Sequence, residues 1–304
     1  MIISASRRTD IPAFYSQWFM NRIRAGCCLT ANPYQPSRLE RVSLLPEEVE
    51  VIVFWSKNPA PLLPHLAELE QLGYRTYFLF TLHDYPPGLE PGVPELHTRL
   101  RTFRTLSEAI GPQRVAWRYD PIILSDRTDA AFHRAAFERL SRALEGATER
   151  VIISVIDIYR KTEYRLKRLE SRHGYSFVRR PLLHPELPGL LADMKALAAA
   201  AGMSIQSCCE EDVVLQAAGI PRGACIDGRL LAGLWSLPVT GKDPYQRAGC
   251  GCAKAKDIGV FHTCLHGCAY CYATAGEDAA RRRYLDHDPA APILYMPRSQ
   301  GSGS

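Results

Sequence analysis

One segment of the chain reads Val51-Ile52-Val53-Phe54-Trp55-Ser56-Lys57-Asn58-Pro59. Its first five residues are β-branched or aromatic and do not alternate with polar residues, which is typical of a strand buried on both faces of a parallel sheet. A polar segment that ends in proline follows at once. This order, an apolar strand and then a polar turn, recurs along the first two thirds of the chain.

The same pattern predicts six strands, at residues 1–6, 49–55, 76–82, 114–118, 151–156 and 203–207. Helical periodicity separates and follows them, at residues 13–25, 61–72, 95–110, 129–144, 161–172 and 187–201. A repeated strand-then-helix order with short connections predicts a parallel α/β fold. Residues 1–219 are therefore expected to form one core.

Polar residues follow almost every predicted strand, at residues 7–10, 56–59, 83–85, 119–121, 157–159 and 208–211. A (β/α) barrel builds its active site at the C-terminal ends of all its strands, whereas a doubly wound sheet uses only the ends near its switch point. We therefore expect a complete or partial (β/α) barrel with parallel strands. Residues 220–298 are cysteine-rich and are expected to carry a cluster loop and close the barrel. Residues 299–304 have the composition of a flexible tail.

The composition is that of a globular enzyme, with 46% hydrophobic and 23% charged residues. No apolar run approaches the length of about 18 residues that suggests a membrane span, and the first ten residues do not resemble a signal peptide. We therefore expect a cytoplasmic protein, in which ten cysteines indicate metal binding or catalysis rather than disulfides. The net charge of +5 is compatible with a nucleic-acid or other anionic substrate.

The densest cysteine cluster is Cys264, Cys268 and Cys271, spaced Cys-x3-Cys-x2-Cys with an aromatic residue before the last. Three thiolates on one short loop can hold one face of a cubane iron–sulfur cluster and leave its fourth iron without a protein ligand. The alternative is a structural zinc site completed by His262 or His266. Three cysteines this close would crowd one tetrahedron, which favours the cluster.

This spacing, with Tyr270 directly before the last cysteine, is similar to the signature of the radical S-adenosylmethionine superfamily. The resemblance implies a [4Fe-4S] cluster whose open iron binds S-adenosyl-L-methionine, with the backbone around Tyr270 against adenine. It also implies oxygen-sensitive, reductive cleavage of the cofactor to methionine and a 5'-deoxyadenosyl radical, with an electron donor such as flavodoxin or ferredoxin. In ordinary members the triad follows the first strand. Here residues 257–263 would be that strand and residues 276–284 the next helix, so the order is permuted.

The chain also resembles a widespread bacterial family of uncharacterised proteins over nearly its whole length. Its marks here are residues 6–10, 54–59 and 117–121, together with the C-terminal cysteines. That resemblance implies no known substrate. Residues 54–59 are further similar to a Ser/Thr-Lys-Ser segment of the spore photoproduct lyase branch. By that likeness Lys57 pairs with the cofactor carboxylate and Ser56 hydrogen-bonds nearby; the alternative is a surface lysine.

Two other strand ends supply partners for anions and hydroxyls. Arg118, with Arg7 or Arg8, can hold the cofactor carboxylate or a substrate phosphate through two hydrogen bonds. Asp10 can accept a ribose hydroxyl or form an ion pair with one of these arginines. We therefore predict that Arg118, Arg8 and Asp10 bind the cofactor.

Asp120 and Tyr159 are the catalytic candidates. Asp120 can accept a ribose hydroxyl or pair with a neighbouring arginine. Tyr159 can donate hydrogen to a substrate radical, or serve only in aromatic packing. The substrate itself is open: a nucleic-acid lesion or modified base is one candidate, and a small molecule or peptide is another.

A second set consists of Cys208, Cys225, Cys250 and Cys252, with Cys209 as an alternative to Cys208. Four thiolates suit a closed [4Fe-4S] cluster or a four-thiolate zinc site. Buried, inert cysteines are the alternative. The glycines beside Cys250 and Cys252 favour a backbone that wraps closely around an ion.

The sequence therefore predicts a radical S-adenosylmethionine enzyme that acts on an unknown substrate. The alternative is a non-radical, zinc-stabilised α/β hydrolase or binding module, whose cysteines only stabilise the C-terminal region. The remaining cysteines, at residues 27–28, are expected to pack in the core. No phosphate-binding loop, nucleophile elbow or His-Glu-x2-His motif is present.

Overall fold

The structure is a computed structural model of the chain. It describes residues 1–32, 35–86, 88–209, 216–247 and 249–296, with the backbone alone at residues 36 and 37. The predicted tail, residues 299–304, and the polar residues 210–211 lie outside these ranges. No helix within them is long and apolar enough to cross a membrane.

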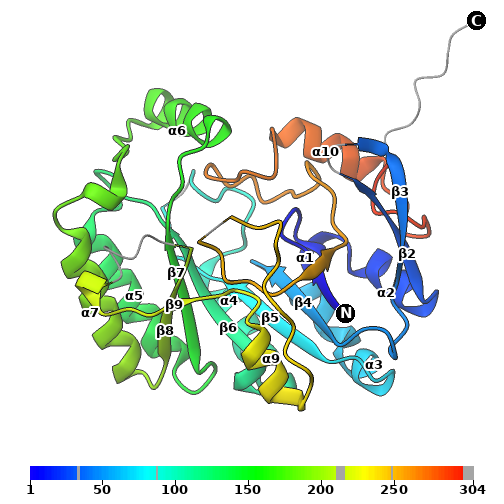
Figure 1. Cartoon of the computed structure of the whole chain (residues 1–304). Coiled ribbons are helices and arrows are strands. Elements are labelled where there is room, and N and C mark those ends of the chain that lie inside the picture. Colours follow the sequence, from blue (N-terminus) through cyan, green and yellow to red (C-terminus); the bar gives the residue numbers. More distant parts are fainter. Residues whose placement is uncertain (33–34, 87, 210–215, 248, 297–304) are drawn as a thin grey trace, which may run out of the picture.

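The centre of the molecule is a curled sheet of eight parallel strands in the order β10-β1-β4-β5-β6-β7-β8-β9 (Figure 1). The sheet forms a partial barrel, which confirms the predicted fold class. Its strands are β1 (Ile2–Ala5), β4 (Val51–Ser56), β5 (Thr76–Thr81), β6 (Val115–Ile122), β7 (Arg150–Val155), β8 (Ser204–Cys208), β9 (Arg222–Gly223) and β10 (Ala255–Asp257). The six strands predicted from the sequence are all present.

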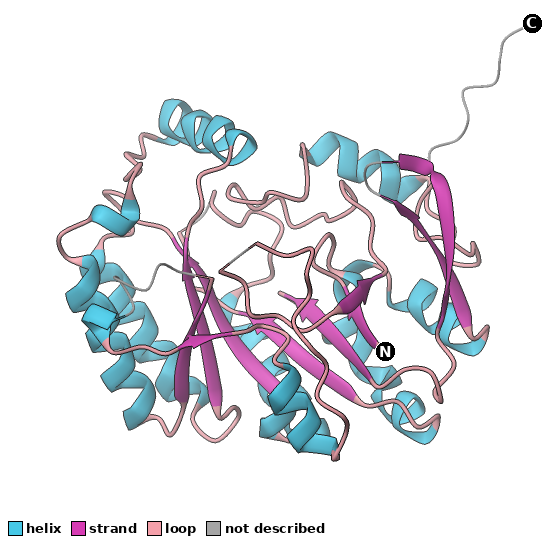
Figure 2. Ribbon diagram, viewed as in Figure 1, coloured by secondary structure: helices cyan, strands magenta, loops and turns pink. Residues whose placement is uncertain are grey.

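The helices also follow the prediction closely. They are α1 (Ile11–Phe14), α2 (Ser16–Arg24), α3 (Leu66–Gln71), α4 (Leu96–Ile110), α5 (Ala130–Leu144), α6 (Arg160–His173), α7 (Leu187–Ala200), α9 (Gly228–Trp235) and α10 (Glu277–Leu285). The helix predicted at residues 13–25 is divided into α1 and α2 at Tyr15, and α3 is preceded by a 3-10 turn (Ala60–His65) that contains two prolines. Figure 2 shows loops gathered beyond the strands, between α6 and α10.

Both faces of the sheet are buried, which explains why its strands show no alternation. Ile52 and Phe54 of β4 belong to the larger core, which the sheet shares with helices such as α4 and α5. Val51 and Val53 belong to a second core, which includes Leu231 of α9. Side chains at successive strand positions point to opposite faces, so each face must be apolar in its own right.

The C-terminal region supplies both edges of the sheet. β10 pairs in parallel with β1, with Ile2 opposite Ala255, so the last strand lies beside the first. The strand predicted at residues 257–263 was placed too late, because the chain turns at Asp257. The Asp257 carboxylate accepts hydrogen bonds from Ser6 Oγ at 2.7 Å and from the Gly259 amide at 3.0 Å.

No helix or strand was predicted between residues 220 and 256. This region contains the two-residue strand β9 and the helix α9, which packs against the second core. An antiparallel hairpin of β2 (Cys27–Asn32) and β3 (Gln35–Ser43) was not predicted. Cys28 is buried in the larger core, as expected.

Candidate active site at the C-terminal ends of the strands

A cavity of about 470 Å³ lies at the C-terminal ends of the sheet strands. Every site residue predicted from the sequence lines it: Arg8, Asp10, Ser56, Lys57, Arg118, Asp120, Tyr159, Tyr270, Cys208, Cys225, Cys250, Cys252, Cys264, Cys268 and Cys271. Cys209 and Arg7 line it as well. The fold thus brings the predicted residues together, and their individual roles stay predictions.

The triad Cys264, Cys268 and Cys271 lies on the loop between β10 and α10. Burial raises the pKa of the Cys268 thiol to about 12. Burial, with the nearby Asp10 carboxylate, also raises the pKa of Cys264 well above its ordinary value. The charges of the other two cysteines of the triad raise the pKa of Cys264 further. A thiol in this setting becomes a thiolate when a cation balances the charge.

Asp10 ties this loop to the rest of the site. One carboxylate oxygen accepts the amide of Ala13 at 3.0 Å and caps α1. The other accepts the Lys57 amide at 2.7 Å and His266 Nε2 at 2.7 Å. With three protein donors, Asp10 is a positioning residue for the loop, and its predicted cofactor contact stays a prediction.

Both histidines near the triad are held by hydrogen bonds. His266 lies between two acceptors, with Nε2 2.7 Å from the Asp10 carboxylate and Nδ1 3.2 Å from the Gly92 carbonyl. His262 Nδ1 accepts the Ala275 amide at 2.7 Å. Burial lowers the pKa of His262, which is consistent with a neutral ring that carries its proton on Nε2. A metal ion would have to displace these contacts at both nitrogens of His266 and at Nδ1 of His262.

The carbonyls of the cysteine loop converge on one arginine. Arg165 of α6 donates to the Cys268 carbonyl at 3.1 Å and the Cys271 carbonyl at 3.0 Å, and also to the Thr274 carbonyl. On the other side, the loop backbone approaches Gly92 so closely that a Cβ there would lie 2.6 Å from the Leu265 carbonyl oxygen. The loop shape is therefore set by protein contacts.

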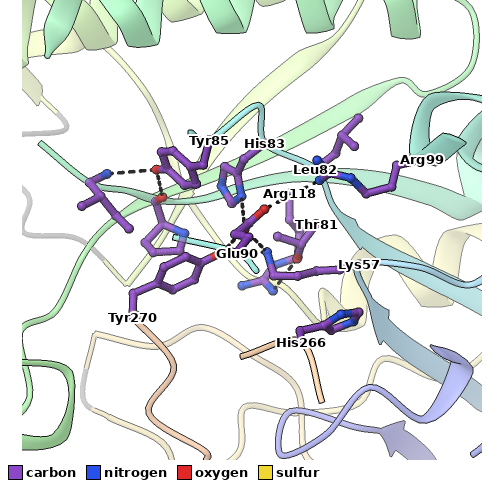
Figure 3. A network of polar contacts seen from close by, with 12 residues as sticks. Lys57, Thr81, Leu82, His83, Tyr85, Glu90, Arg99, Arg118, His266 and Tyr270 are labelled. Atoms are coloured by element: carbon purple, nitrogen blue, oxygen red, sulfur yellow. Dashed lines mark hydrogen bonds and ion pairs between the residues drawn. The ribbon is translucent and has the colours of Figure 1, made fainter. Parts of the chain in front are cut away.

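Glu90 is the centre of a buried polar network at the wall of the cavity (Figure 3). Lys57 Nζ lies 2.6 Å from its Oε1, His83 Nδ1 lies 3.3 Å away, and Tyr270 donates to the same oxygen. Arg99 pairs with the other oxygen at 3.7 Å. Burial would raise the pKa of Glu90, but Lys57, His83 and Arg99 hold it well below its ordinary value. The carboxylate is therefore charged and is paired with Lys57.

Trp55 lies between two arginines of the cavity wall. The guanidinium groups of Arg7 and Arg118 lie 5.3 Å and 4.7 Å from the centre of its ring. Arg118 also pairs with Asp120 and donates to Thr81 Oγ1 at 3.3 Å. Arg118 Nε and Arg7 Nη2 are buried without a hydrogen-bond partner among the described residues. These two groups can bind an anion that enters the cavity.

The other predicted residues have protein partners too. Arg8 donates to the Gly259 carbonyl at 3.2 Å and stacks on Phe261, and Ser56 Oγ accepts the Asn58 amide at 3.0 Å. Tyr159 is 46% exposed and lies beside Arg247, which pairs with Asp157. Tyr159 therefore belongs to the mouth of the cavity, whereas Ser56 is buried in its wall.

The second set of cysteines is in direct contact. The sulfurs of Cys208 and Cys225 lie 3.1 Å apart, and the Ile226 amide donates to the Cys252 sulfur at 3.5 Å. Hydrogen bonds from the thiols of Cys208, Cys225 and Cys250 lower the pKa of Cys252. The hydrogen bond with Cys208 lowers the pKa of Cys225. Contact with Cys252 and burial outweigh this effect and raise the pKa to about 11. Cys208 makes one of these sulfur contacts, and Cys209 lines the same cavity.

Sequence comparison places the chain in one protein family. The profile of that family matches residues 2–273, from the first residue of β1 to just beyond the triad. The chain belongs to the family described as "Domain of unknown function (DUF1848)". The comparison with curated proteins finds no match.

Three residues of this DUF1848 site were missed in the sequence: Glu90, Arg165 and Asp257. Asp257 is a polar residue at a strand end, as the other predicted residues are, but Ala255–Asp257 is too short and too polar to be predicted as a strand. In the described ranges, no group of three or more His, Cys, Asp or Glu side chains is arranged to hold one metal ion as it stands. In a cubane cluster each thiolate binds a different iron, so the thiols do not need to converge on one ion.

Proposed function

We propose that this DUF1848 protein is a radical S-adenosylmethionine enzyme whose catalytic cluster is held by Cys264, Cys268 and Cys271. The observation that carries the proposal is the position of the triad. Its loop follows β10, the parallel neighbour of β1, at the edge of the sheet where the cavity opens. A loop after the first strand of an ordinary member would start from the same edge.

The residues around the triad fit a cluster better than a zinc ion. The three thiols come from one loop, and in the described part of the chain no further His, Cys, Asp or Glu side chain joins them in an arrangement that could hold one metal ion; His266 already faces Asp10 and the Gly92 carbonyl. Three thiolates with no protein group to complete a tetrahedron suit a cluster that keeps one iron open. When bound, such a cluster supplies the electron that cleaves S-adenosylmethionine into methionine and a 5'-deoxyadenosyl radical.

The groups of the cavity wall have donors left for an anionic ligand. An ammonium has three hydrogens, and Glu90 and Tyr270 take two of those on Lys57. Arg118 Nε and Arg7 Nη2 have no partner in the described structure. We assign Lys57 and Arg118 to the carboxylate of the cofactor and Arg7 to an anionic group of the substrate.

The protein also holds the reaction volume in shape. The Glu90 network fixes Lys57 and Tyr270, and Asp10 fixes the turn at His266. These groups therefore do not need to reorganise when ligands bind. The volume of about 470 Å³ is typical of a small-molecule site. A flipped-out base or a free small molecule would fit this class of cavity, and a duplex nucleic acid would have to present such a base.

The deciding experiment is an anaerobic incubation of the reconstituted protein with a reductant and S-adenosylmethionine. We expect a brown protein that forms 5'-deoxyadenosine, and a Cys268→Ala variant that forms none. Cys27→Ala is the matched control, because it removes a thiol far from the cavity and should leave the product unchanged. Formation of 5'-deoxyadenosine by Cys268→Ala, or none by the wild-type protein with a full complement of iron, would contradict the proposal.

A further inference from the structure

Four thiols outside the triad come together from three separate segments. Cys208 ends β8, Cys225 follows β9, and Cys250 and Cys252 lie on the segment between α9 and β10. Parallel pairing of β8 with β9 sets Cys208 opposite Gly223, which brings Cys225 within reach. In Figure 1 the segment after α9 crosses in front of the sheet on its way to β10. Cys250 and Cys252 lie on this segment, and the Cys252 sulfur accepts hydrogen bonds from the other three thiols.

The backbone around these thiols is built for close approach. A Cβ at Gly223 would lie 2.2 Å from the Gln206 side chain, and one at Gly251 would lie 3.3 Å from the Gly223 carbonyl oxygen. Glycines at these two positions allow the loops to close on each other. The Ile226 amide is directed at the Cys252 sulfur, as amides in metal–thiolate loops are.

Ordinary core packing does not account for this arrangement. Cys28 packs in the larger core. Cys225, Cys250 and Cys252 belong to the second core and are 2–7% exposed, but their sulfurs also contact other thiols of the same set. A disulfide between Cys208 and Cys225 would need their sulfurs to move from 3.1 Å to about 2.05 Å and would leave the other two thiols in place.

We propose that Cys208, Cys225, Cys250 and Cys252 form a second, closed metal centre, in which four thiolates bind a thiophilic metal. The shared chemistry is four-sulfur ligation, which zinc and iron both accept. Zinc–sulfur bonds of about 2.3 Å place the sulfurs of a tetrahedron about 3.8 Å apart. The Cys208–Cys225 pair at 3.1 Å must therefore open by roughly 0.7 Å for one ion, and further for a cluster.

The centre is closed because all of its ligands come from the protein. Each thiol that becomes a ligand gives its proton to solvent, and no ligand position is left for substrate. The centre would therefore join segments rather than activate a molecule. It links the end of β8, the edge strand β9 and the segment that leads to β10, and it does so on the wall of the same cavity.

The test uses a Cys264→Ala/Cys268→Ala/Cys271→Ala variant, which lacks the triad, so its result does not depend on the proposed function. We expect this variant, purified anaerobically, to keep metal bound through sulfur, measured by elemental analysis and X-ray absorption at the metal edge. Zinc at about one per chain identifies a single ion, and about four irons with labile sulfide identify a cluster. Either result supports the centre.

Adding Cys225→Ala to the triad variant should remove the metal, and adding Cys27→Ala should not. A triad variant that is folded by circular dichroism but binds no metal would overturn the proposal, as would a Cys208–Cys225 disulfide in it. If the Cys225→Ala protein does not fold, cobalt(II) titration of the triad variant replaces it. Intense visible absorption with thiolate charge-transfer bands supports four-sulfur ligation, and the pale spectrum of hydrated cobalt overturns it.

Discussion

The two cysteine sets share one cavity but are built in opposite ways. The triad Cys264, Cys268 and Cys271 spans eight residues of one loop, and that loop is held by protein contacts. The second set spans residues 208–252 on three segments; its sulfurs contact one another, and backbone hydrogen bonds such as that from the Ala253 amide to the Ile226 carbonyl at 2.8 Å also join the segments. The triad therefore depends on the shape of one loop, whereas a metal in the second set would link three segments that lie far apart in the sequence.

The largest effect is expected from removing metal from the second set. In the triad variant, a chelator should lower the thermal unfolding midpoint by roughly 10 °C, because three segments lose their common ligand. In a Cys250→Ala/Cys252→Ala variant that keeps the triad, the same chelator should change the midpoint by less than about 2 °C. Differential scanning calorimetry measures both. Equal shifts of the unfolding midpoint in the two variants would contradict the proposed difference between the two cysteine sets.

A smaller effect should follow from Glu90→Gln, which breaks the network beside the triad. Loss of the carboxylate leaves Lys57 and Arg99 without their buried partner, which costs about 3–5 kcal/mol of unfolding free energy. Lys57→Met combined with Glu90→Gln should lose less than the sum of the two single changes, because each partner is costly mainly when the other remains. Urea denaturation of the four proteins measures the coupling. Additive losses would show that the pair is not the source of the stability.

Arg165→Gln should have the smallest effect on stability and a specific effect on metal. Three carbonyls of the triad loop lose this donor, but Arg165 is only partly buried and water can replace it, so the total cost should be about 1.5–3 kcal/mol. We expect the iron held by the triad to decrease while the metal of the second set stays constant. Arg168→Gln, an exposed arginine of the same helix, is the control. A loss of metal from both sets would mean that Arg165 acts on the whole fold.

The fold could be predicted because strands buried on both faces have a distinct composition. Val51–Ser56 shows this, with one apolar face for each core and polar residues only where the strand ends. The hairpin β2–β3 was missed because β3 is mostly exposed and has no apolar pattern. β10 was misplaced because three residues are too few for a periodic signal.

The cavity residues could be predicted wherever they directly follow a strand. Glu90 could not be, since it lies well beyond the end of β5 in a loop whose path depends on Gly92 and the triad loop. Arg165 is one of several arginines on α6, and nothing in the sequence separates it from those that face solvent. The roles of both residues depend on tertiary contacts with residues that are far away in the sequence.

The pairing of β1 with β10 also has a consequence for how the chain is made on the ribosome. Ile2 is translated about 250 residues before its partner Ala255. At a synthesis rate of about 5–20 residues per second, the edge of β1 that pairs with β10 stays unpaired for roughly 10–50 s. The triad is translated only after that neighbour, so the nascent chain has its sheet and cavity wall nearly complete before the first triad cysteine appears. Synthesis order alone then keeps the triad thiols from loading metal on an unfinished protein.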